Sequence, residues 1–225
     1  MEKKINRWKL RRCDAAAILT LGLMVAAMGP MTAVAMDPTL QLLKPQTDTQ
    51  PFLQLLAKRA SSRSYRAQPL SPQTLSNLLW SAVGISRPES GMRTAPSANN
   101  KQEIDVYVAM GDGIYLYDAK ANQLKLIVQG DHRGAAGTQS YVKDAALNLI
   151  YVADYEKSGG KSDEDKLLYA AAATGFISEN VYLYCASAGL ATVIRAYVDR
   201  PALAEIMKLR PNQKIILAQT VGYPK

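Results

Sequence analysis

Residues 105–117 contain the feature that most restricts the fold of this chain, because two alternating stretches flank a tight glycine turn. DVYVAM and IYLY are joined by Gly111-Asp112-Gly113, a turn composition that is typical of β-hairpins. Further strands are predicted at 124–128 and 149–153, and the apolar run 214–221 has the composition of a central strand. These segments predict one sheet that is built mostly from antiparallel neighbours.

Four other segments have helical periodicity, and they lie before and after the predicted strands. Ser71 and Pro72 are typical of a helix start, and Gly84 is typical of a helix end. In the longest segment, Gly175 is expected to interrupt the helix or to let another backbone approach closely. The predicted class is α+β, with a mostly antiparallel central sheet flanked by helices. The helical segments are 52–59, 71–84, 167–188 and 201–208.

Residues 1–35 have the order of a secretory signal peptide. Six Lys and Arg residues precede an apolar run from Ala15 to Met28, and Ala33-Val34-Ala35 resembles a cleavage site. The run is short for a membrane span of about 20 residues, and a retained anchor is the alternative. We therefore expect an exported protein, periplasmic or secreted, without a stable membrane anchor after cleavage. Arg11-Arg12 leaves the general and the twin-arginine export routes open.

The rest of the chain is expected to be one domain at 51–225, preceded by a proline-containing linker or arm at 36–50. Removal of residues 1–35 lowers the formal charge from +8 to +4, with 21 basic and 17 acidic residues left. That excess is too small to indicate nucleic-acid binding. Cys185 and His132 are the remaining cysteine and histidine, which excludes an internal disulfide and a Cys/His metal site. We expect Cys185 to be buried and His132 to be solvated.

Three polar stretches are not explained by a simple core. Arg59, Ser61 and Arg63 place two guanidinium groups and a hydroxyl at a helix end, a combination that suits phosphate binding. Residues 96–100 combine a rigid proline with amides that can bond the edge of a planar heterocycle. Residues 188–195 contain a glycine and small residues that let a flat ring approach the backbone. Taken singly, the three stretches also have plain interpretations as a solvated loop, a turn and a helix end.

In this order the three stretches resemble the nitroreductase family, with its R-x-S-x-R-x-[FY], P-S-x-x-N and G-L-G-t-v motifs. The end of the chain, VGYPK at 221–225, is similar to the closing segment of that family. LLWSAVGISRP at 78–88 and RTAPSA at 93–98 most resemble the thiazole/oxazole-forming FMN dehydrogenases and their small relatives. The matching residues are Arg59, Ser61, Arg63, Tyr65, Pro96, Ser97, Asn100, Gly189, Leu190, Ala191, Thr192 and Val193.

The resemblance implies that FMN binds at the interface of a homodimer, with both subunits contributing. Arg59 and Ser61 are expected to hold the ribityl phosphate, and Lys225 is expected to complete that clamp. Arg63 is expected at the pyrimidine edge of the flavin, and Asn100 on the ring. The backbone of residues 191–194 would then lie near flavin N5 and O4.

Two residues depart from the family pattern. Ala60 replaces a frequent basic or polar residue, and Ala191 replaces the second glycine of G-L-G. No catalytic side chain and no metal ligand is predicted. The complete set of expected cofactor-binding residues is Arg59, Ala60, Ser61, Arg63, Pro96, Ser97, Asn99, Asn100, Gly189, Ala191, Thr192, Val193 and Lys225.

The resemblance also implies an FMN-dependent oxidoreductase. The expected reaction moves hydride or electrons from NAD(P)H or another reductant to a small organic acceptor such as a nitro compound or a quinone. A flavin-dependent dehydrogenase of a small substrate is one alternative, and a non-catalytic flavin-binding or electron-relay module is another. Export makes NAD(P)H an awkward donor, because free nicotinamide nucleotide is not expected outside the cytoplasm.

Overall fold

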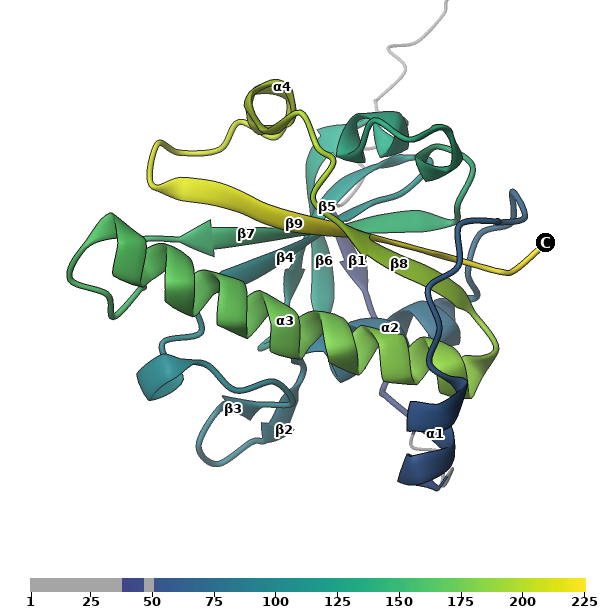
Figure 1. The fold of residues 1–225 in the computed structure, drawn as a ribbon, viewed down its shortest axis with the longest axis horizontal. Coiled ribbons are helices and arrows are strands. Elements are labelled where there is room, and N and C mark those ends of the chain that lie inside the picture. Colours follow the sequence, from purple (N-terminus) through teal and green to yellow (C-terminus); the bar gives the residue numbers. More distant parts are fainter. Residues whose placement is uncertain (1–37, 47–50) are drawn as a thin grey trace, which may run out of the picture. The chain divides into compact units, whose positions relative to one another are not determined.

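The computed structural model describes residues 38–46 and 51–225, so the predicted signal peptide lies outside the described residues. Its main element is a seven-stranded sheet in the order β1-β6-β5-β4-β7-β9-β8, and every neighbouring pair is antiparallel (Figure 1). A separate pair, β2 and β3, forms a small hairpin. The strands are β1 (Thr39–Gln41), β2 (Ile85–Arg87), β3 (Met92–Arg93), β4 (Ile104–Ala109), β5 (Gly113–Asp118), β6 (Gln123–Gln129), β7 (Leu147–Asp154), β8 (Ala191–Arg195) and β9 (Gln213–Gly222).

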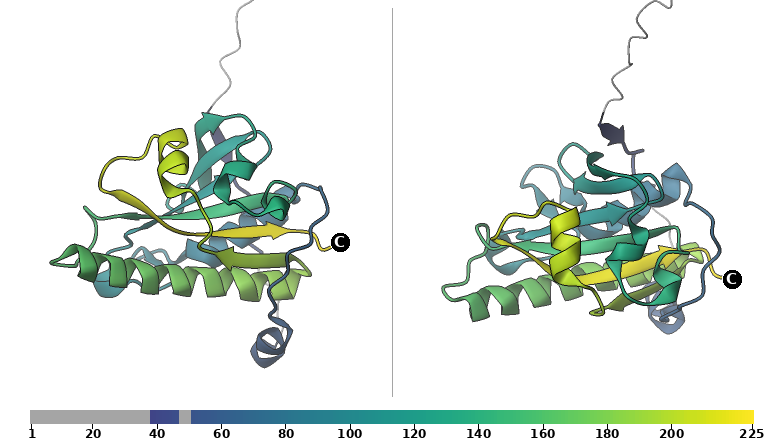
Figure 2. Two further views of the ribbon diagram at one scale, coloured as in Figure 1. Left: turned by 45° about the horizontal axis from the view of Figure 1, so that its top comes forward. Right: turned by 90° about the horizontal axis from the view of Figure 1, so that it is seen from above.

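Helices cover both faces of this sheet, as the two views of Figure 2 show. The long helix α3 and helix α2 pack on one face, while α4 and two short 3-10 turns at 133–136 and 140–142 lie on the other. The α+β class with an antiparallel sheet flanked by helices is thus confirmed. The helices are α1 (Phe52–Lys58), α2 (Pro72–Val83), α3 (Asp163–Ala188) and α4 (Arg200–Ile206).

Strand β7 shows why the sheet holds the two layers together. All eight of its residues are buried. Successive side chains of a strand point to opposite faces, and both faces of this strand are covered. Leu149 and Tyr151 pack toward α2 and α3, whereas Ile150 and Val152 pack toward α4 and the 3-10 turns. Each such apolar side chain contributes roughly 1.5–3 kcal/mol when it is fully buried. The neighbouring β9 lies between β7 and β8, which confirms its predicted central place.

Helix α3 continues through Gly175, so the predicted interruption at this residue is wrong. The helix runs for 26 residues, from a capping box between Ser162 and Asp165 to a cap at Gly189. A Cβ atom added at Gly175 would have no neighbour within 4 Å, so no other backbone approaches there. One glycine costs a helix only about 1 kcal/mol, which the long capped helix tolerates.

Part of the predicted linker at 36–50 is instead a strand of the sheet. Thr39–Gln41 forms β1 and pairs with β6 at the sheet edge. The Gln41 side chain donates to the carbonyl oxygen of Asn122 at 2.9 Å, and Leu42 is buried in the core. Burial of Leu42 stabilises the short strand β1 in addition to its backbone pairing with β6, because apolar surface is removed from water.

No helix within 38–46 and 51–225 is both long and apolar enough to cross a bilayer.

Candidate cofactor-binding site

The first polar stretch runs along the outer edge of β8 and beside the end of the chain. The backbone N–H of Ser62 donates to the carbonyl oxygen of Thr192 at 2.9 Å, which joins the first stretch to the third. Tyr65 forms a β-bridge with Pro224, and the N–H of Lys225 reaches the carbonyl oxygen of Ser64 at 3.4 Å. The structure therefore brings residues 59–65, 189–193 and 225 to one edge of the sheet, near the end marked C in Figure 1.

Tyr182 of α3 ties these segments together, although its role was not anticipated from the sequence. Its hydroxyl lies 2.8 Å from Oγ of Ser61 and accepts the N–H of Ile194 at 3.1 Å. The guanidinium carbon of Arg59 lies 5.3 Å from the centre of the Tyr182 ring, in a cation–π arrangement. A buried tyrosine on a helix face needs a hydrogen-bond partner for its hydroxyl. This requirement is the one feature of the sequence that could indicate a linking role for Tyr182.

The edge formed in this way carries five cationic side chains. Lys58, Arg59, Arg63, Arg66 and Lys225 all come from the first stretch or the chain end. Among the described residues, none of these five cations takes part in an ion pair. A hollow of about 130 Å³ lies at this edge, and its lining includes Lys58, Ser62 and Tyr182 among mostly apolar residues. Cations and hydroxyls that bond no carboxylate side chain are donors that suit a phosphate monoester.

The third stretch offers its backbone to this edge and keeps its side chains inside the protein. Gly189 has a φ of +66°, a left-handed conformation that ends α3 and turns the chain into β8. Ala191, Thr192 and Val193 are buried, and the Thr192 hydroxyl donates to the carbonyl oxygen of Thr220 at 2.9 Å. A flat ring could therefore contact only the outward backbone groups of β8. Two of these groups are already hydrogen-bonded, the carbonyl oxygen of Thr192 to Ser62 and the N–H of Ile194 to Tyr182.

The second polar stretch lies elsewhere in the chain, so one subunit does not bring all three predicted stretches together. Pro96 and Ser97 border a small hollow that α3 lines with Ala173 and Ile177. Ile177 precedes Tyr182 by five positions, which corresponds to about 7.5 Å along a helix, and Ala173 is farther still. The Ser97 hydroxyl accepts the N–H of Gln102 at 2.9 Å, which holds the loop.

Two asparagines give this second loop its shape. Asn99 and Asn100 have φ values of 51° and 52°, a left-handed conformation that asparagine tolerates better than most residues. Both are exposed on the surface. The Asn100 amide oxygen accepts from Nε2 of Gln102 at 3.0 Å, which helps to hold the loop.

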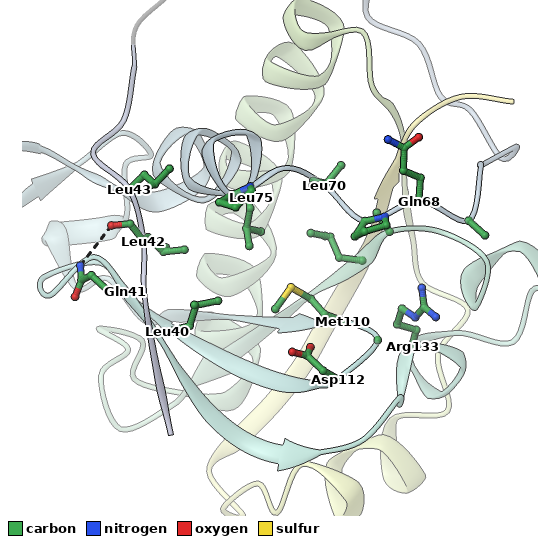
Figure 3. A pocket seen from close by; sticks show the side chains of 16 residues that line it. Leu40, Gln41, Leu42, Leu43, Gln68, Leu70, Leu75, Met110, Asp112 and Arg133 are labelled. Atoms are coloured by element: carbon green, nitrogen blue, oxygen red, sulfur yellow. Dashed lines mark hydrogen bonds between the residues drawn. The ribbon is translucent and has the colours of Figure 1, made fainter. Parts of the chain in front are cut away.

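A larger pocket of about 570 Å³ lies apart from the predicted cofactor residues and contains none of them (Figure 3). Leu40, Leu42 and Leu43 face Leu75 and Met110 across it. Arg133 lines one end, but it forms an ion pair with Asp131 at 2.7 Å, which lowers the pKa of that carboxyl mainly through the side-chain hydrogen bond. With its one guanidinium neutralised, this pocket lacks the donor set of a phosphate site.

Cys185 and His132, the cysteine and histidine of the described residues, lie outside any metal-binding cluster. Among the described residues, no group of three or more His, Cys, Asp and Glu side chains could hold a metal ion. Cys185 is buried as predicted, and burial raises the pKa of its thiol far above the usual range. Half-buried His132 contacts the carbonyl oxygen of Gln129 at 3.1 Å.

Comparison with known proteins agrees with this geometry. A profile of the nitroreductase family matches residues 56–223. A protein of Methanocaldococcus jannaschii described as a nitroreductase is 29% identical over 193 residues, which cover 81% of this chain and 96% of the relative. A crystal structure described as a nitroreductase from Ralstonia eutropha is 39% identical, with a TM-score of 0.80 over 84% of this chain and 90% of the other.

A third structure, from Desulfovibrio desulfuricans, was solved in complex with FMN. It is 19% identical, with a TM-score of 0.58 over 79% of this chain and 88% of the other, so the likeness shows a shared fold.

The family match and these relatives identify the protein as a flavin-dependent oxidoreductase, and its antiparallel sheet with covering helices is the fold of those relatives. The chain belongs to the nitroreductase family, with FMN as its cofactor.

Proposed function

We propose that this protein works as an exported homodimer that transfers electrons through FMN to a small organic acceptor such as a nitro compound or a quinone. The observation that supports FMN binding most directly is the group of unpaired cations and hydroxyls along β8 in the described part of the chain, which suits the phosphate of FMN. Bound FMN would supply the hydride- or electron-transfer chemistry. The protein holds and orients the cofactor in this proposal.

One chain supplies the phosphate clamp in this proposal. Arg59 and Ser61 stand over and beside the Tyr182 ring, which fixes their positions. Arg63 and Lys225 are exposed and unpaired in the described part of the chain, so both can turn toward an anionic ligand. We assign Arg59, Ser61 and Lys225 to the phosphate and Arg63 to the pyrimidine edge.

The second chain supplies the other side of the site. Pro96, Ser97, Asn99 and Asn100 are not beside β8 of their own chain, and the two asparagines are exposed. A partner subunit that brings this loop to the first chain would complete the cofactor site. Exposed apolar side chains on α1 and α3 support such a pairing, namely Phe52, Leu53, Leu56, Leu167, Leu168 and Phe176.

The electron donor in this proposal depends on the compartment in which the protein works. NAD(P)H is the donor if the protein reaches it, and a membrane-associated reductant such as a quinol is the donor if the protein is exported. N-terminal sequencing of exported material tests the export itself, and we expect it to begin near Met36. An intact Met1 in the membrane fraction would favour the retained anchor instead.

The proposed reaction is tested on the purified full chain. We expect a yellow protein that releases FMN on denaturation and is reoxidised by a nitroaromatic compound or a quinone after anaerobic reduction. Separate additions of NADH, NADPH and a soluble quinol identify the donor by which of them bleaches the flavin bands. A colourless protein that does not take up added FMN would overturn the proposal, and bound flavin inert to all three donors would favour an electron-relay module.

A further inference from the structure

Arg195, at the end of β8, is a buried cation that has no anionic partner among the described residues. Its side chain is 6% exposed. The guanidinium group donates to Oγ1 of Thr220 at 3.0 and 3.1 Å, to Oδ1 of Asn148 at 2.7 Å, and to the carbonyl oxygen of Ala136. All these acceptors are neutral. By contrast, Arg210 is bonded to two carboxylates.

The surrounding structure forms a fitted socket for this side chain. A Cβ atom added at Gly137 would lie 2.2 Å from Nη1 of Arg195, so the position admits no larger residue without displacement. The Asn148 amide nitrogen donates to the carbonyl oxygen of Val142 at 2.9 Å, which turns the amide oxygen toward the guanidinium. Residues of β7, β9 and a 3-10 turn therefore cooperate to hold the charge in place.

Stability alone does not explain this arrangement. An unpaired buried charge is strongly unfavourable, and replacing buried ionic groups by apolar residues is often neutral or stabilising. Burial lowers the pKa of Arg195 to about 10, yet the group remains charged at neutral pH. A socket that keeps a cation without its counter-ion is the arrangement expected where a ligand supplies the negative charge.

The location of Arg195 identifies that ligand. It lies three positions after Thr192, whose carbonyl oxygen joins β8 to the first polar stretch. Tyr65 of that stretch packs against Ala191 on the same strand. Arg195 thus directly follows the backbone of residues 191–194, which the family resemblance places near flavin N5 and O4.

We propose that Arg195 is a positioning residue whose buried charge favours reduced FMN over oxidised FMN. The inference rests on the proposed function. Uptake of two electrons and one proton converts oxidised FMN into a form with one additional negative charge on the ring. A fixed cation beside the ring favours that form, because no protein group has to reorganise when the charge appears.

The test compares the affinities of the full chain for oxidised and reduced FMN. Dithionite, which is oxidised to sulfite, supplies the electrons, and the midpoint potential is read against a reference dye. We expect Arg195→Gln to reduce the preference for reduced FMN at least tenfold, which lowers the midpoint potential by about 30 mV for a two-electron couple. Arg195→Lys keeps the positive charge, so its midpoint potential is expected to be closer to that of the unaltered protein.

Two further variants keep the test decisive if Arg195→Gln does not fold. Asn148→Asp places a carboxylate against the guanidinium and is expected to lower the midpoint potential while Arg195 stays in place. Arg200→Gln removes an arginine from α4 that also bonds backbone carbonyls, those of Ile215 and Ile216, and should leave the potential unchanged.

A purely structural Arg195 would overturn the inference. In that case Arg195→Gln would lower the thermal stability of the apoprotein, and the midpoint potential would not move in either Arg195→Gln or Asn148→Asp. Bound FMN with an unmoved potential would reject this inference alone. Failure of the unaltered chain to bind FMN would reject it together with the proposed function.

Discussion

At the scale of single residues, the candidate site depends on Tyr182 more than on any residue found from the sequence motifs. One hydroxyl group joins the first polar stretch to β8, through Ser61 and Ile194. The motif residues could be recognised because their types and order follow a family pattern. Tyr182 and Arg195 could not, because their importance arises from contacts between distant parts of the chain.

Substitution of Arg59 tests the phosphate clamp. We expect Arg59→Ala to weaken FMN binding by about 1.5–3 kcal/mol, the contribution of a hydrogen bond to a charged group. A fluorescence titration of the apoprotein with FMN measures this change. Arg200→Ala serves as the matched control, because it removes the same side chain from α4 without touching the β8 edge. Unchanged FMN affinity in Arg59→Ala would remove this residue from the site.

Loss of the Tyr182 hydroxyl is expected to destabilise the apoprotein. In Tyr182→Phe the half-buried N–H of Ile194 loses its acceptor, and the lost hydrogen bond costs about 0.5–1.5 kcal/mol. Tyr184→Phe is the control on the same helix, since its hydroxyl donates to the carbonyl oxygen of Thr74 at a longer 3.3 Å and does not contact β8. Urea unfolding of both variants gives the comparison, and equal losses would show that Tyr182 has no special linking role.

At the scale of secondary structure, strong burial decided which elements could be predicted. Strands β7 and β9 each contain an apolar run because they are covered on both faces, and this composition is visible in the sequence. β8 begins two residues after the glycine that ends α3, and β1 is three residues long, so neither has a recognisable pattern of its own. Their pairing partners lie far away in the sequence, and only the folded sheet supplies them.

Helix α3 provides a test of the structural role of its glycines. Gly175 is exposed and has open space where a Cβ would lie, so Gly175→Ala should stabilise the protein by about 0.5–1 kcal/mol. Gly189→Ala should instead destabilise it by roughly 1–2 kcal/mol, because its φ of +66° is left-handed. Thermal unfolding of both apoproteins separates the two cases, and a destabilising Gly175→Ala would mean that this face of α3 is covered.

At the scale of the whole molecule, the position of the second polar stretch shows how much of the candidate site one chain can form. Its family motif is recognisable in the sequence, but its place along α3 is set by tertiary folding. A single chain gathers the first and third stretches at β8 and leaves Asn99 and Asn100 exposed. The sequence could therefore indicate the cofactor and the fold, whereas the proposed division of the site between two subunits is a matter of assembly that a single chain does not contain.

Mixed dimers test this division directly. One subunit carries Arg59→Ala, and the other carries Asn99→Ala together with Asn100→Ala. We expect each variant alone to bind FMN weakly, and the refolded mixture to recover about one quarter of the sites, since half of randomly paired dimers are mixed and each has one intact site. Recovery is measured as FMN bound at a concentration that leaves both separate variants empty. No recovery on mixing would contradict a cofactor site shared between two subunits.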